Sequence, residues 1–124
     1  MIVIENVDYI GITVSDMDNA ISFYSDLFDF EVVERVSNTD EAYIRVGDIL
    51  LKLVEVKDFK APENLKNNIC FYIDEEDFDD AIDELQEKNI TIVHGPENIR
   101  KGRLVVFTDP DGNKIELRYP RFSL

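Results

Sequence analysis

An internal repeat runs through most of the 124 residues of this sequence and sharply limits the folds that it can adopt. Residues 10–14 match residues 69–73 in their strand-like pattern, and the turn at Gly47 has its counterpart in the turn at Gly112. The offset between matching positions stays at about 60 residues, and a fixed period of this size indicates a duplicated supersecondary unit. We therefore expect two copies of one unit.

The first copy is predicted to have the element order β-α-β-β-β. Residues 7–14 alternate and are rich in β-branched side chains, which is typical of a strand. Ser15 or Asp16 is expected to cap a helix, because apolar residues follow at helical spacing from Met17 to Phe28. Three further strands are expected over residues 30–36, 41–46 and 49–56.

The second copy is predicted to repeat this order. Residues 68–74 form a predicted strand, and an amphipathic helix follows that ends near Asn89. A short strand over 90–93 is expected to lead into a loop over 94–102, because two glycines and a proline interrupt the pattern there. The last two strands are expected over residues 103–108 and 113–119, joined by a turn over 109–112.

The chain is predicted to be a single domain over residues 1–124. Module one covers about residues 1–57, and module two covers about residues 68–119. The polar segment between them, about residues 58–67, lacks periodicity and is interpreted as a linker.

Composition excludes several classes of partner. The formal net charge of −14 argues against nucleic acid, whose phosphates would be repelled, and against anionic membrane surfaces. No apolar run approaches the roughly 20 residues of a membrane span. Cys70 is the only cysteine, so neither an intrachain disulfide nor a cysteine-based zinc cluster can form. We therefore expect a cytoplasmic protein with no membrane or nucleic-acid partner.

Two segments resemble a known family. The opening YIGITV with the following DMDNAISFYSDLFDFEVVE, and the closing FTDPDGNKIEL, are similar to the vicinal-oxygen-chelate superfamily of glyoxalase I, bleomycin-resistance proteins and extradiol dioxygenases. The resemblance implies an α+β fold of two tandem βαβββ modules that form a cupped mixed sheet, and it implies a homodimer. It does not name a reaction, because one fold hosts many chemistries.

The resemblance also implies where a metal would bind. Metal-dependent members place one ligand, usually His or Glu, on each of four strands, and here these positions hold Tyr9, Lys52, Asn68 and Glu116. Only Glu116 is an ordinary ligand of a divalent cation, because charged Lys52 offers no lone pair and Tyr9 would have to ionise. We therefore expect no metal and no cofactor.

Strand alternation predicts which side chains line the cup. The expected ligand-binding residues are Tyr9, Lys52, Asn68, Tyr72, Glu116 and Arg118. Lys52 and Glu116 are equivalent in the two copies, so the ammonium of Lys52 could replace the charge of a metal and pair with Glu116. Alternatively, Lys52 extends to the mouth of the cup and contacts only water.

Three functions are compatible with these features, and no catalytic residue is assigned. The first is a metal-free protein that binds a small organic molecule in the cup, similar to bleomycin-resistance proteins. The second is a metal-dependent lyase, isomerase or dioxygenase with an atypical site, most simply a glyoxalase-like lyase or isomerase. The third is a dimeric accessory domain without chemistry. The sequence favours the first.

Overall fold

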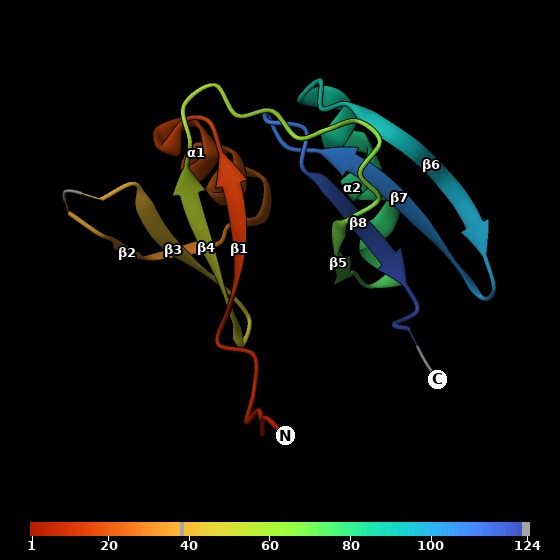
Figure 1. Cartoon of the computed structure of the whole chain (residues 1–124). Coiled ribbons are helices and arrows are strands. Elements are labelled where there is room, and N and C mark those ends of the chain that lie inside the picture. Colours follow the sequence, from red (N-terminus) through yellow and green to blue (C-terminus); the bar gives the residue numbers. More distant parts are fainter. Residues whose placement is uncertain (38, 123–124) are drawn as a thin grey trace. The chain divides into compact units, whose positions relative to one another are not determined.

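The computed structural model describes residues 1–37 and 39–122, and in these residues the β-α-β-β-β order occurs twice (Figure 1). The first copy consists of β1 (Tyr9–Val14), α1 (Met17–Phe28), β2 (Glu31–Arg35), β3 (Glu41–Val46) and β4 (Ile49–Glu55). The second consists of β5 (Asn68–Tyr72), α2 (Glu75–Glu87), β6 (Ile92–Ile99), β7 (Gly102–Thr108) and β8 (Lys114–Tyr119). The predicted α+β class with two βαβββ modules is confirmed.

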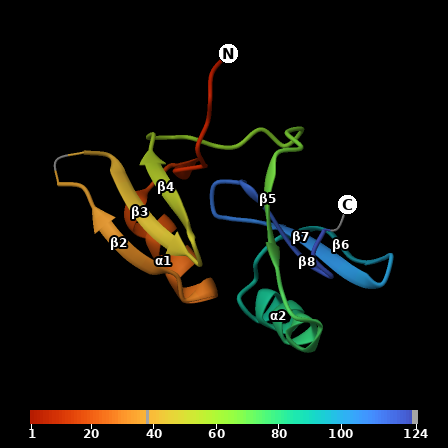
Figure 2. The same ribbon diagram turned by 90° about the horizontal axis from the view of Figure 1, so that it is seen from below.

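The chain divides into two compact units, a first unit over Met1–Lys60 and a second unit over Ala61–Leu124. Each unit has its own four-stranded sheet, with strand orders β1-β4-β3-β2 and β5-β8-β7-β6. In both sheets the first strand pairs in parallel with the last, and the remaining pairs are antiparallel. One helix lies along one face of each sheet (Figure 2).

The core of the first unit lies between α1 and its sheet. Alternate side chains of β1 and β4 are buried on this face, as the strand period of two requires. The buried apolar residues of the first unit are Ile12, Val14, Met17, Ala20, Tyr24, Ala42, Ile44, Leu51 and Leu53.

The core of the second unit follows the same rule. On β8 every second residue is buried, and α2 covers this face with apolar residues at helical spacing. The ring of Phe78 on α2 meets the ring of Tyr119 edge-on, with centroids 5.3 Å apart. The buried apolar residues of the second unit are Phe78, Ile82, Leu85, Val105, Phe107, Ile115, Leu117 and Tyr119.

Helix α1 begins at two carboxylates. Asp16 is the N-cap, and its side chain accepts a hydrogen bond from the backbone N–H of Asn19 at 2.9 Å. Glu55, at the end of β4, accepts the N–H of Met17 at 2.7 Å. Free N–H groups at a helix start favour such acceptors. Of the two predicted caps, the structure selects Asp16.

The structure corrects the predicted loop over residues 94–102. Strand β6 continues to Ile99 and pairs with β7, so His94 lies on a strand. The register shifts between Ile92 and His94 and again between His94 and Glu97, which accommodates the Gly95-Pro96 pair. An edge strand tolerates such bulges and a proline because its outer side needs no ladder hydrogen bond.

The turn before β8 is held by one buried carboxylate. Asp109 Oδ1 accepts the N–H groups of Asp111 and Asn113, both at 2.9 Å, and its Oδ2 accepts the Asn113 side-chain amide at 2.8 Å. Gly112 has φ +87°, which favours glycine. The turn therefore fixes where β8 begins, and with it the side chains that β8 presents.

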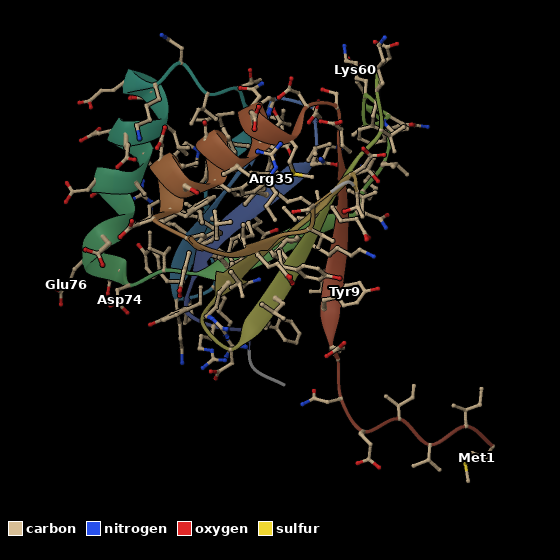
Figure 3. The ribbon with its side chains drawn as sticks, turned by 90° about the vertical axis from the view of Figure 1, so that its left-hand side faces the viewer. Met1, Tyr9, Arg35, Lys60, Asp74 and Glu76 are labelled. Atoms are coloured by element: carbon tan, nitrogen blue, oxygen red, sulfur yellow. The ribbon has the colours of Figure 1, made fainter. Side chains whose placement is uncertain are left out.

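The segment before β1 is extended and exposed. Strand β1 begins at Tyr9 rather than at residue 7, and Figure 3 shows Met1 at the far end of this segment. Ile2, Val3 and Ile4 are at least 79% exposed. Among the described residues, no helix has both the length and the apolar character needed to cross a membrane.

Truncating Phe107 to alanine is expected to lower the free energy of unfolding by about 3–5 kcal/mol, because its fully buried ring leaves a cavity. The measurement is urea denaturation followed by circular dichroism. Val93→Thr is the matched control: it changes an exposed side chain of the same sheet and should cost less than about 0.5 kcal/mol. Equal losses in the two variants would contradict this description of the core.

Candidate functional site

Polar side chains gather on the sheet faces that point away from the helices. On β4 and β8 the buried apolar residues alternate with less buried ones, among them Lys52, Glu116 and Arg118. Each of the two units contains its own distinct group of interacting side chains on this face.

In the first unit Lys52 is held by Glu41 of β3. The Lys52 Nζ lies 2.6 Å from Glu41 Oε2, and the two side chains are 19% and 31% exposed. The hydrogen bond from Lys52 to Glu41, together with the negative charge of Glu41, raises the pKa of Lys52, and partial desolvation opposes this only in part. Lys52 is therefore a fixed ammonium whose charge is largely compensated.

Two tyrosines flank this ammonium. Lys52 Nζ lies 5.0 Å from the centre of the Tyr9 ring, within the range of a cation–π interaction. Tyr9 meets Tyr43 edge-on, with ring centroids 5.9 Å apart. Tyr43 pairs directly with Lys52 in the β3–β4 register and is only partly buried. It therefore belongs with the Lys52 group and not with the buried core.

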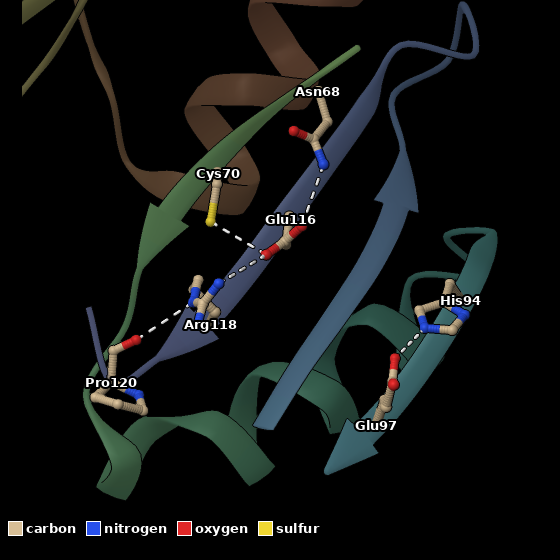
Figure 4. Close-up of polar contacts among 7 residues, drawn as sticks. All are labelled: Asn68, Cys70, His94, Glu97, Glu116, Arg118 and Pro120. Carbon is tan, nitrogen blue, oxygen red and sulfur yellow. Dashed lines mark hydrogen bonds and ion pairs between the residues drawn. The ribbon is translucent and has the colours of Figure 1, made fainter. Parts of the chain in front are cut away.

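In the second unit Glu116 is the centre of a group of donors (Figure 4). Asn68 Nδ2 donates to Glu116 Oε1 at 3.2 Å, and Cys70 Sγ donates to Glu116 Oε2 at 3.4 Å. Asn68 and Cys70 lie on β5, which runs parallel to β8 with Cys70 directly beside Glu116. The parallel pairing therefore brings residues 46 and 48 positions apart in the chain to one carboxylate.

This arrangement suppresses ionisation of the thiol. Partial desolvation, followed by the charge of Glu116 and the hydrogen bond to it, raises the pKa of Cys70 to about 12, although the residue as a whole is exposed. The positive charge of Arg118 lowers the pKa of Cys70, but this effect is smaller than the combined effects that raise it. Cys70 is thus a protonated donor to Glu116 at neutral pH.

Arg118 lies two residues after Glu116 on the same face of β8. Its Nε donates to the backbone oxygen of Pro120 at 3.3 Å, and its Nη1 is 3.9 Å from Glu116 Oε2. The second of these distances is too long for a direct hydrogen bond. Arg118 is therefore anchored by the backbone and only loosely paired with Glu116.

Tyr72 is turned toward the end of its strand. Its hydroxyl donates to Asp74 Oδ1 at 3.0 Å, and this hydrogen bond raises the pKa of Tyr72. The Arg121 guanidinium lies 5.9 Å from the ring centre. Tyr72 is 52% exposed, and its hydroxyl is bonded to a different carboxylate from the one that Asn68 and Cys70 contact. Its predicted role in ligand binding stays a prediction.

The predicted Lys52–Glu116 pair also stays a prediction, because it would join the two units. The structure gives each residue partners within its own unit.

Glu41 was missed by the sequence reasoning, although a signal was available. Glu41 and Tyr43 are two residues apart on β3 and therefore share a face, and Tyr43 lies opposite Lys52.

His94, the only histidine, lies on β6 and interacts with Glu97 (Figure 4). Both side chains are about half exposed, at 58% and 48%. The pair belongs to the bulged edge strand of the second unit. It is separate from the hydrogen bonds around Glu116.

The four positions assigned to a metal by resemblance do not form an ordinary ligand set. Lys52 is a cation paired with Glu41, and the Asn68 amide nitrogen is turned to Glu116. Over residues 1–37 and 39–122, no three His, Cys, Asp or Glu side chains gather closely enough to hold a metal. Of the four residues, Glu116 alone fits a divalent cation by its chemistry, and the expectation that these four positions hold no metal stays a prediction.

Comparison with known sequences gives a family and named relatives. Residues 6–117 match the Glyoxalase/Bleomycin resistance protein/Dioxygenase superfamily. The metallothiol transferase FosB of Staphylococcus epidermidis is 37% identical over 117 residues, which covers 92% of this chain and 81% of the relative. The metallothiol transferase FosB of Lysinibacillus sphaericus is 30% identical over 118 residues, covering 91% and 81%.

Solved structures with the same fold include fosfomycin resistance proteins. FosX from Mesorhizobium loti has a TM-score of 0.79 and 25% identity, and the match covers 97% of this chain and 96% of that one. A mutant of FosX from Listeria monocytogenes, with a TM-score of 0.79 and 19% identity over 93% and 92% of the chains, was solved with Mn(II) and 1S,2S-dihydroxypropylphosphonic acid.

These findings overturn the prediction of a metal-free binding protein. The relatives are enzymes that carry the name metallothiol transferase, and a protein of the same fold holds Mn(II). The prediction of a binding protein was wrong because it rested on the residue types at four positions. Those residue types bear on how a metal could be coordinated, and they do not decide whether a chain is an enzyme. The match over residues 6–117 shows that this chain belongs to the Glyoxalase/Bleomycin resistance protein/Dioxygenase superfamily.

Proposed function

We propose that this chain is a metal-dependent enzyme with an atypical site, which modifies a small phosphonate such as fosfomycin. The observation that carries the proposal is its similarity to metallothiol transferases at up to 37% identity over 92% of the chain. The likeness to a fosfomycin resistance protein at 25% identity over 97% of the chain supports the same substrate class.

The side chains around Glu116 suit such a reaction. Glu116 is the one ordinary cation ligand among the four positions, and Asn68 and Cys70 fix its orientation through both oxygens. A carboxylate held in this way keeps its geometry when a substrate arrives.

The test is incubation of the purified protein with fosfomycin and either L-cysteine or water, with and without divalent cations including Mn(II). We expect ³¹P NMR to show consumption above a protein-free control when a cation is present. Glu116→Gln should reduce the rate by at least about 100-fold, since it removes the central carboxylate. Glu87→Gln, on the exposed face of α2, is the matched control and should leave the rate unchanged. No consumption with any cation would overturn the proposal.

In the metal-free protein the raised pKa of Cys70 keeps its thiol protonated at neutral pH. A pKa of about 12 predicts that iodoacetamide at pH 8 labels Cys70 about 1,000-fold more slowly than a thiol with the ordinary pKa of 9.0. Removing the charge of Glu116 should speed the labelling, so Glu116→Gln is the informative variant. Mass spectrometry gives both rates, and labelling at the speed of a free thiol would contradict this assignment.

We also propose that the protein is a cytoplasmic homodimer that binds a small molecule. The single cysteine is compatible with a reducing compartment, and related folds commonly assemble as dimers. Size-exclusion chromatography with light scattering should give about twice the monomer mass of 14.4 kDa. A monomer across the concentration range used for the activity assay would contradict the dimer.

A further inference from the structure

The guanidinium of Arg118 is left with unused hydrogen-bond donors. A guanidinium carries five N–H donors, and among the described residues only Nε has a close acceptor, the Pro120 oxygen at 3.3 Å. Within residues 1–37 and 39–122, the terminal nitrogens contact only Glu116, at 3.9 Å. The Arg118 side chain is 24% exposed, so these donors are partly withdrawn from water yet open to a ligand.

Arg118 differs in this from Lys52, a cation on β4, which occupies the same place in the sheet of the first unit as β8 does in the second. Lys52 Nζ is 2.6 Å from Glu41 and lies over Tyr9, so its charge is already engaged. An anion arriving at Lys52 would meet the adjacent Glu41 carboxylate. Since an ion pair at 2.6 Å is much tighter than one at 3.9 Å, Arg118 is the cation with more capacity to bind an added anion.

The neighbouring Glu116 does not remove this capacity. Its Oε1 accepts from Asn68 and its Oε2 accepts from Cys70, so neutral donors satisfy both oxygens. The anchored Nε holds the plane of the Arg118 guanidinium while the terminal nitrogens remain available. Figure 4 shows Arg118 between Glu116 and the Pro120 oxygen.

Local positive charge matters in this chain, because its formal net charge of −14 repels anions in general. A planar guanidinium with free terminal N–H groups matches two oxygens of a phosphonate or carboxylate. We propose that Arg118 binds the oxyanion of the substrate through its terminal nitrogens and thereby determines the preference for a phosphonate. The choice of a phosphonate rests on the proposed function.

The test is titration of the full-length protein with methylphosphonate, followed by ¹H–¹⁵N NMR, which also shows whether each variant is folded. Arg118→Gln should weaken binding by about 10–100-fold, because it removes a charge-assisted pair of hydrogen bonds. Arg118→Lys, which keeps the charge without the planar fork, should recover part of the loss. Arg100→Gln, at an exposed position in the same unit, makes the same change in net charge and should alter affinity less than about twofold.

Equal weakening by Arg118→Gln and Arg100→Gln would overturn the inference in favour of a general charge effect. Unchanged affinity in Arg118→Gln, or no binding by the unmodified protein, would also overturn it. Binding that depends on Arg118 in a protein that does not consume fosfomycin would leave the inference standing and remove only the proposed function. If Arg118→Gln consumes fosfomycin with an unchanged KM, the proposed function would stand and the inference about Arg118 would be overturned.

Discussion

Both units of this protein depend on the alternation of side chains along each strand, which places every second residue in a core covered by one helix. In each unit the apolar residues of the strands must face one helix, so the residues between them face the other way. A slip of one residue in β8 would bury Glu116 and Arg118 and expose Ile115 and Leu117. The Asp109 turn sets where β8 begins, and the burial of the apolar face holds that register.

The same pairing that builds the core decides how charges are distributed on the opposite face. In the first unit it brings Glu41 to Lys52 and produces a nearly compensated ion pair. In the second unit it brings Asn68 and Cys70 to Glu116, and these neutral donors leave Arg118 only loosely engaged. Duplicated units with one fold therefore present different chemistry, because their partly exposed side chains differ while their buried ones are alike.

Membership in the superfamily and the residue types at the four positions assigned by resemblance answer different questions. The relatives named metallothiol transferases match most of the chain, and the superfamily and the fold carry over to it. The expectation drawn from the residue types at these four positions led to the wrong function, because a fold by itself does not fix the chemistry that it carries.

The duplication, the fold class and most strands could be predicted from the amino-acid sequence, because these depend on local periodicity, which a linear pattern carries. The shared face of Glu116 and Arg118 was equally predictable, since they are two residues apart on one strand. The continuation of β6 through Gly95 and Pro96, the contact of Glu41 with Lys52 and the hydrogen bond from Cys70 to Glu116 emerged only from the folded chain. These features depend on which strands pair and in what register, and pairing between distant segments is set by packing that no local pattern encodes.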